Sequence, residues 1–247
     1  MIETPRSLLR ESKKNLEMGL LLVILHAALM LNPAPADRPG TFYVEKSGSD
    51  EHPGTSKDRA FLTLNRAFLF LRDGDTLYIG EGTFTLTRPL EWMGSIHITG
   101  KGCEKTIIQA GEKPVRDKGS VFTFSVMYNM KYTGCGREIP VSVIEGVTLQ
   151  NGAAPAAEPS PTSVGGGIKN FAGLHIRNCI IQNNTAFNGG GIYNAGVLHL
   201  ENSIIRNNHA HHLEGAVFNT PDAVYSHDGC VFNSNTQDLT CTSNTRE

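Results

Sequence analysis

Short stretches of alternating apolar and polar residues return along the chain at a fixed interval of 24 residues. Residues 174–177 alternate an apolar side chain with a polar one, which is typical of a strand with one buried face. The same alternation returns at residues 198–201, and runs of glycine and asparagine, which tolerate a positive φ at turns, separate the stretches. A fixed period of this length indicates a solenoid, whose successive copies stack on one another.

Strands this short cannot pair within one copy, so each must pair with the equivalent strand of the next copy, about 4.8 Å away. The sequence therefore predicts an all-β fold, a parallel β-helix. The repeat also predicts ladders of stacked residues. The inner apolar ladders are Ile168 over Ile192, Leu174 over Leu198 and Ile181 over Ile205, and the expected corner ladders are Asn178 over Asn202 near Asp228, and Asn184 over Asn208 over Asn235.

Other copies depart from the 24-residue interval. Residues 144–152 match residues 176–184 at an offset of 32, which predicts an enlarged loop at 153–163. Weaker copies at 215–219 and 231–235 are offset by 25 and 27 from the preceding copy, and irregular terminal copies are typical of a capped end.

The first part of the expected domain reads as a cap. Thr63 is predicted to cap a helix whose apolar face is Leu64, Ala67, Phe68 and Leu71, ending at 73–75. This short capping α-helix is expected to cover the open end of the stack, whose unpaired strand edges would otherwise recruit other chains. We expect a single domain over 37–247, with the cap at about 41–85, the rungs at about 86–236 and a polar tail at 237–247.

The N-terminal segment reads as an export signal. Four basic residues precede the apolar run 19–31, and small residues at 34–36 offer a cleavage site. We expect residues 1–36 to be a signal peptide, with an uncleaved N-terminal anchor as the alternative. The protein is then secreted or held at the cell surface.

The net charge and the cysteines limit which classes of protein this chain can belong to. The formal net charge of −2 lacks the basic excess of an electrostatic nucleic-acid binder. Five cysteines in an exported chain leave at least one unpaired. Cys179 and Cys230 occupy equivalent positions two rungs apart, which is too far for a disulfide. Two pairings stay open: Cys103 with Cys135, and Cys230 with Cys241.

The stretch 42–85 contains Tyr-Val, Gly-Ser-Asp, Pro-Gly-Thr and then Gly-Asp-Thr-Leu-Tyr-Ile before Glu-Gly-Thr-Phe. It is similar to the N-terminal cap of secreted bacterial β-helix proteins. The Gly-Gly-Gly-Ile and Asn-Asn repeats resemble those of polymorphic outer-membrane-type proteins, whose GGAI motif is matched loosely at 166–168 and 190–192 and whose FxxN motif is matched at 232–235. Over residues 42–236 the chain thus resembles the pectin-lyase-like superfamily, which implies a right-handed parallel β-helix. That fold hosts enzymes, adhesins and proteins of other roles, so it implies no single activity.

Enzymes of this superfamily carry clusters of carboxylates, or calcium-binding aspartates with an arginine base. Residues 144–208 contain no aspartate at all. Glu145, Arg177 and Glu201 are expected to stack on the outward face, most simply as an ion-pair ladder. The catalytic alternative assigns Arg177 the role of a general base or of a clamp for a sugar carboxylate, and Glu201 the role of a general acid. Hydrolysis by Glu145 and Glu201 would need carboxyl groups about 5–9.5 Å apart.

Two histidine groups offer further chemistry. His175 is expected over His199, with Lys169 and Tyr193 two strands back. This group is either a solvated polar face or a strip that contacts carbohydrate. His209, His211 and His212 are expected in a loop. They carry metal-ligating imidazoles, but their spacing matches no closed zinc site, so we predict no metal and no cofactor. The glycine triplets lack the following Lys-Ser/Thr of a nucleotide loop.

We predict a non-catalytic, glycan- or surface-binding or adhesion module, whose partner is an extracellular polysaccharide or a cell-surface molecule rather than nucleic acid. The alternative is a polysaccharide-active lyase or glycoside hydrolase that acts on the outer face of the β-helix. A third hypothesis is a short relative of a longer repeat protein with no activity of its own.

Overall fold

The computed structural model describes residues 40–111, 121–125, 139–154 and 163–236. The chain divides into two compact units, Met1–Arg38 and Pro39–Glu247, and all the described residues belong to the second. The expected signal segment 1–36, most of the expected loop 153–163 and the tail 237–247 lie outside the described residues. No helix in the described part of the chain is long and apolar enough to cross a membrane.

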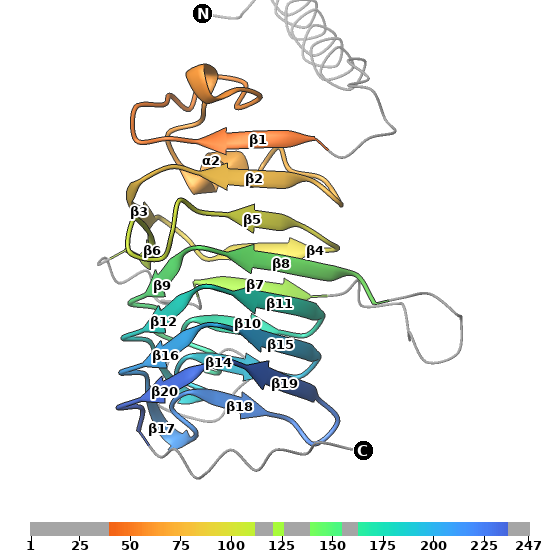
Figure 1. Ribbon diagram of the computed structural model, residues 1–247, viewed down its shortest axis with the longest axis vertical. Helices are drawn as coiled ribbons and strands as arrows, with labels where there is room; N and C mark the ends of the chain where they lie inside the picture. Colours follow the sequence, from red (N-terminus) through yellow and green to blue (C-terminus); the bar gives the residue numbers. More distant parts are fainter. Residues whose placement is uncertain (1–39, 112–120, 126–138, 155–162, 237–247) are drawn as a thin grey trace, which may run out of the picture. The chain divides into compact units, whose positions relative to one another are not determined.

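Three sheets make up the described unit, with a fourth, smaller one beside them (Figure 1). The seven-stranded sheet contains β1 (Thr41–Val44), β2 (Thr76–Ile79), β5 (His97–Thr99), β8 (Val141–Glu145), β11 (Gly173–Arg177), β15 (Val197–Glu201) and β19 (Val224–Asp228), in that order. The five-stranded sheet contains β4 (Leu90–Met93), β7 (Phe122–Ser125), β10 (Ile168–Asn170), β14 (Ile192–Asn194) and β18 (Val217–Asn219). The six-stranded sheet contains β3 (Gly82–Leu86), β6 (Thr106–Ala110), β9 (Thr148–Gln150), β12 (Ile180–Gln182), β16 (Ile204–Arg206) and β20 (Val231–Asn233). The two-stranded sheet pairs β13 (Thr185–Asn188) with β17 (His209–Leu213).

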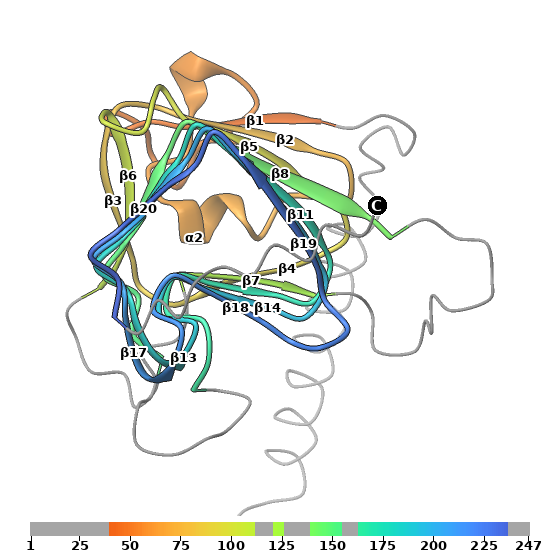
Figure 2. The ribbon, with the colours of Figure 1, turned by 60° about the horizontal axis from the view of Figure 1, so that its bottom comes forward.

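Every strand pairing in the described residues is parallel and joins a strand to its equivalent in a neighbouring coil. Figure 2 shows the coils superimposed around a common interior. The fold is the right-handed parallel β-helix that the sequence predicts. The offsets are confirmed too: Ile168 pairs with Ile192, Arg177 with Glu145, and Ile204 with Val231.

The interior is a continuous column of buried, mostly apolar side chains, to which several strands each contribute two. All six residues of the predicted inner ladders are buried, and their exposed fractions are at most 2%. Burial of one such side chain contributes about 1.5–3 kcal/mol. Inward packing in every coil therefore fixes which residues must point outward.

The cap differs from its prediction. The helix α2 spans Leu64–Ala67, a single turn rather than the longer helix expected, and Phe68 ends it. Thr63 is the N-cap as predicted, and its hydroxyl accepts a hydrogen bond from the Arg66 amide. The ring of Phe68 packs in the interior against two other aromatic rings, Trp92 and Phe122, on the apolar side that the spacing predicts. The short 3-10 helix η1 (Lys57–Arg59) lies in the preceding loop.

Asparagines stack at two corners. Asn184 donates to Asn208, which donates to Asn235, each bond 3.0 Å long, so this predicted ladder is confirmed. A second ladder that the sequence did not predict joins Asn170, Asn194 and Asn219 through amide bonds of 2.9 Å. The other predicted pair, Asn178 and Asn202, lies at left-handed turn positions, with φ of 53° and 46°.

Among the described cysteines, Cys103, Cys179 and Cys230 are free thiols. Cys179 and Cys230 do not pair with each other, as expected from their separation by two rungs. Cys135 and Cys241, the other members of the two open pairings, lie outside the described residues.

Candidate functional site

The outward side of the seven-stranded sheet carries most of the chemistry that the sequence singles out. Leu198 and Leu200 point inward and are buried, so His199 and Glu201 between and after them must face out. The same alternation holds in the neighbouring strands. We call the outward residues of β5, β8, β11, β15 and β19 the polar face: His97, Thr99, Glu145, His175, Arg177, His199, Glu201, Ser226 and Asp228.

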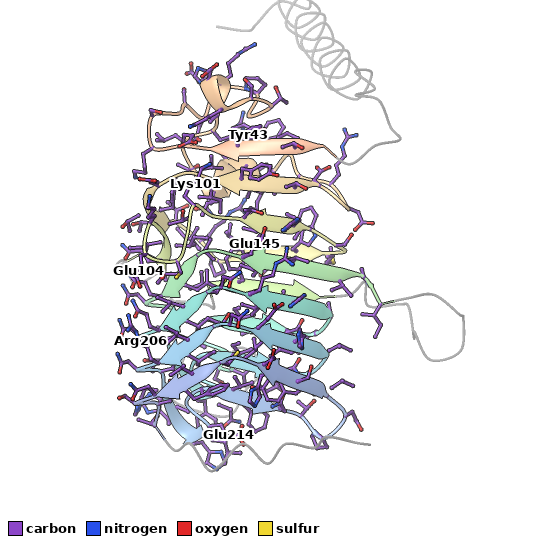
Figure 3. All side chains as sticks on the ribbon, viewed as in Figure 1. Tyr43, Lys101, Glu104, Glu145, Arg206 and Glu214 are labelled. Atoms are coloured by element: carbon purple, nitrogen blue, oxygen red, sulfur yellow. The ribbon has the colours of Figure 1, made fainter. Side chains whose placement is uncertain are left out.

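Strand register arranges these residues in two columns. The first column is continued by two tyrosines on β1 and β2, and runs Tyr43, Tyr78, Thr99, Glu145, Arg177, Glu201, Asp228. The second runs Thr41, Thr76, His97, Val143, His175, His199, Ser226. Figure 3 shows Tyr43 on β1 and Glu145 on β8, on the face turned toward the viewer. At about 4.8 Å per rung, the first column is about 29 Å long.

Glu145 is the centre of one polar cluster. Its Oε1 lies 3.0 Å from His97 Nε2 and accepts a hydrogen bond of 3.1 Å from Thr99 Oγ1. Its Oε2 accepts a hydrogen bond of 2.5 Å from Arg177 Nε. Burial opposes ionisation, but the hydrogen bonds from Arg177 and Thr99 and the positive charge of Arg177 outweigh it, so the pKa of Glu145 is lowered. Glu145 is therefore held as a carboxylate.

A second cluster lies on the next rungs. Glu201 is in register with Arg177, but its carboxylate contacts His175, whose Nε2 lies 3.2 Å from Glu201 Oε2. The rings of His175 and His199 lie 4.7 Å apart with their planes inclined by 58°. His199 Nδ1 lies 2.8 Å from Ser226 Oγ. Of the expected ion-pair ladder, the pair Glu145–Arg177 is therefore formed, whereas the carboxylate of Glu201 contacts His175 instead of Arg177.

The structure divides the four residues expected to contact a ligand between two sheets. His175 and His199 are on the polar face, whereas Lys169 and Tyr193 are register neighbours on the outside of the five-stranded sheet. There Tyr193 stacks on Phe218 with a centroid distance of 5.3 Å. The two pairs do not form one strip, because the chain turns a corner between Asn170 and Gly173.

The histidine run 209–212 lies in strand β17 and not in a loop, so that expectation was wrong. Ala210 is buried, and its two neighbours His209 and His211 are exposed with perpendicular rings 4.7 Å apart. His212 stacks on Phe187 and lies 3.2 Å from Asn188 Oδ1. The strand forms because β13 of the preceding coil gives it a parallel partner.

Sequence reasoning missed the contributions of Tyr43, Tyr78 and His97 to this face. These residues come from the cap and the first coils, where the offsets between paired strands are irregular: Thr76 pairs with His97, and His97 with Val143. Their alternating positions within each strand were the available signal. Without a repeat period, that signal does not reveal which rung each residue joins.

No protein-family model matches the sequence, and no curated protein is significantly similar to it. Solved structures do match. The fold is similar to that of pectin methylesterase PemA from Erwinia chrysanthemi, with a TM-score of 0.51, 13% sequence identity, and coverage of 80% of this chain and 56% of that one. A pectate lyase, Pel9A, aligns with a TM-score of 0.49, 15% identity and coverage of 78% and 48%. A rhamnogalacturonan lyase aligns with a TM-score of 0.41, 15% identity and coverage of 78% and 50%.

The chain thus spans about half the length of the solved structures it matches. At this identity the likeness establishes the β-helix architecture. The activity must be argued from the residues of the polar face.

Proposed function

We propose that this protein binds an extended, neutral polysaccharide on the polar face without cleaving it, as a secreted or cell-surface module. The observation that carries the proposal is the first column, a straight line of tyrosine, threonine and charged side chains across seven strands. A rigid sheet holds these groups at a regular spacing, which suits a polymer with regularly spaced hydroxyl groups.

The contacts within the face support binding rather than turnover. Glu145 is engaged by Arg177, Thr99 and His97, and its pKa is lowered, so it is a poor proton donor. Glu145 and Glu201 are separated by the rung that carries Arg177.

The charge of the face favours a neutral ligand. Three carboxylates, Glu145, Glu201 and Asp228, accompany one guanidinium, so the column has two negative charges in excess, and these would repel a polyanion at the end that carries Glu201 and Asp228. At the other end, Tyr43 and Tyr78 are stacked with a centroid distance of 5.6 Å. Tyrosines combine a flat apolar ring with a hydroxyl group, and Tyr78 is 40% exposed.

The test is a binding screen of the full chain against neutral and uronate-containing polysaccharides, with product release followed in parallel. We expect binding to a neutral polymer, and a loss of about tenfold in affinity, or about 1.4 kcal/mol, for Tyr78→Ala and for Arg177→Ala. Gln182→Ala is the matched control, because Gln182 follows Arg177 in the same coil but lies on the six-stranded sheet. Its affinity should equal that of the unmodified protein.

Three outcomes would overturn the proposal. The first is the absence of binding to any polymer in the screen. The second is equal affinity in all the variants, which would remove the site from this face. The third is release of product that stops in Glu145→Gln, which would establish the enzymatic alternative.

A further inference from the structure

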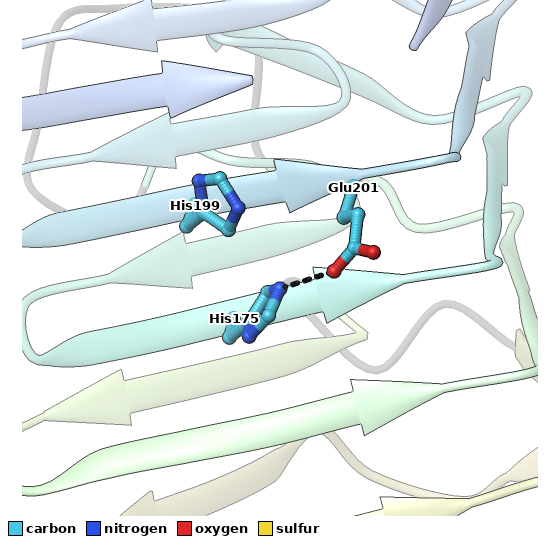
Figure 4. Close-up of side chains that lie close together, drawn as sticks. All are labelled: His175, His199 and Glu201. Carbon is cyan, nitrogen blue, oxygen red and sulfur yellow. Dashed lines mark hydrogen bonds and ion pairs between the residues drawn. The ribbon is translucent and has the colours of Figure 1, made fainter. Parts of the chain in front are cut away.

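One cluster on the polar face has the composition of a metal site (Figure 4). His175, His199 and Glu201 each place one ligand atom within 4.8 Å of the other two. His175 and His199 are register neighbours on β11 and β15, and Glu201 follows His199 by two residues on the same side of β15. The three side chains are half-buried, so they are partly shielded from water.

The backbone holds this cluster rigidly. Leu174 and Ile176 flank His175 and point inward, and Leu198 and Leu200 flank His199 in the same way. All four are at most 2% exposed. The ligands are therefore anchored on two hydrogen-bonded strands whose positions are set by the core. Binding an ion would require changes in side-chain torsions rather than in the backbone.

We infer that His175, His199 and Glu201 form a binding site for a borderline divalent transition ion of the Zn²⁺ class. Imidazole nitrogens and a carboxylate oxygen are typical zinc ligands, at about 2.0–2.2 Å from the ion. Two ligands of a tetrahedral ion with such bonds lie about 3.3 Å apart. His175 Nε2 and Glu201 Oε2 already lie 3.2 Å apart. The inclined ring of His199 can complete the set by a rotation of its side chain.

A neighbouring contact orients the third ligand. His199 Nδ1 lies 2.8 Å from the hydroxyl oxygen of Ser226, its register partner on β19. Histidine ligands usually bond their second ring nitrogen to a nearby polar group, which orients the ring toward the metal. With Nδ1 in contact with Ser226, Nε2 is the nitrogen of His199 left to bind the ion.

Three protein ligands leave a fourth tetrahedral position for water or for an oxygen of a bound molecule. The site is thus of the open type and differs from a closed structural zinc site. A hard cation such as Ca²⁺ takes six to eight oxygen ligands, which two imidazoles and one carboxylate do not supply.

The histidines of β17 are a second group of imidazoles that could bind the ion, and their replacement gives the control. His209 and His211 also lie 4.7 Å apart, but in the described residues they do not join a group of three ligands. The double variant His209→Gln/His211→Gln removes two exposed imidazoles and leaves the polar face intact. It measures how much ion is held by surface histidines alone.

The test is calorimetric titration of the full chain with Zn²⁺ and with Ca²⁺ after treatment with a chelator, together with the visible spectrum of the Co²⁺ form. We expect Zn²⁺ but not Ca²⁺ to bind, and Co²⁺ to give the absorption of a four- or five-coordinate ion. His199→Gln and Glu201→Gln should each weaken Zn²⁺ binding at least tenfold. Ser226→Ala should weaken it about tenfold through the orientation of His199.

The β17 double variant should retain both the Zn²⁺ affinity and the Co²⁺ spectrum, and circular dichroism checks that each variant is folded. The inference is overturned if Zn²⁺ does not bind, or if binding is lost in the β17 variant and kept in His199→Gln. The titrations contain no polysaccharide, so this inference and the proposed function succeed or fail separately.

Discussion

Replacing Asn208 with alanine tests the physical basis of the rung stack. Asn208 is 1% exposed and lies in the middle of a corner ladder. Its Oδ1 accepts from the backbone N–H of Asn184 at 3.1 Å and from Asn184 Nδ2 at 3.0 Å. Its Nδ2 donates to the Ile181 carbonyl at 2.9 Å and to Asn235 Oδ1 at 3.0 Å. One side chain thus joins three successive coils.

The substitution Asn208→Ala removes all four hydrogen bonds and leaves polar groups of two neighbouring coils with fewer partners. A hydrogen bond contributes about 0.5–1.5 kcal/mol net, and an unsatisfied buried group costs about 1–3 kcal/mol. Four bonds therefore predict a loss of about 2–6 kcal/mol in the free energy of unfolding. This loss is a large share of the stability of an ordinary domain.

The assay is urea denaturation of the full chain followed by circular dichroism, with Asn233→Ala as the control. Asn233 is an exposed asparagine of β20, so its replacement should change the free energy of unfolding by less than about 0.5 kcal/mol. Because solenoids can lose cooperativity, the slope of the transition is compared as well as its midpoint. A loss below about 1 kcal/mol for Asn208→Ala, at an unchanged slope, would refute the view that buried amide ladders hold the coils together.

Two further predictions concern ionisable groups. Cys179 is 1% exposed, and its burial raises the thiol pKa to about 12. It should therefore not react with iodoacetamide at pH 8 in the folded protein, whereas unfolding in urea should make it reactive. Modification of Cys179 in the folded protein, detected by mass spectrometry of its peptides, would contradict this prediction. The pKa of Glu145 is lowered in the folded state, so its contribution to stability is present above its ordinary pKa of 4.5 and is lost as the pH falls through the folded value. Between pH 6 and 3 the urea midpoint should therefore fall more steeply for the unmodified protein than for Glu145→Gln, and parallel curves would show that Glu145 makes no such contribution.

The sequence predicts correctly which residues stack in neighbouring coils wherever the repeat interval is regular. The offset of 24 places Ile168 beside Ile192 because in-register parallel pairing and inward burial impose the same alignment. At α2 the sequence predicts the N-cap Thr63 and the buried face correctly but overestimates the length, because the helix spans only Leu64–Ala67. The contacts of Phe68 with Trp92 and Phe122 join segments with no shared period, so the sequence does not predict them.

The candidate sites were harder to predict for a related reason. The pairing of His175 with His199 follows from the repeat, and Glu201 lies two residues beyond His199, so the three ligands could be placed on one face from sequence alone. Whether Glu201 turns to Arg177 or to His175 depends on side-chain torsions, which no period encodes. The structure places its carboxylate at His175.

A β-helix separates the residues that hold the fold from those that give it chemistry. Most inward positions are apolar, with exceptions such as Ser142 in register with Leu174, whereas outward positions are freer to vary from rung to rung. In the second column Val143 lies between His97 and His175. In that column the valine separates His97, which contacts Glu145, from His175, which contacts Glu201, whereas in the first column Arg177 lies between the two glutamates. The face therefore contains two neighbouring clusters, one centred on the Glu145 carboxylate held by Arg177 and one formed by His175, His199 and Glu201, for which we infer metal binding.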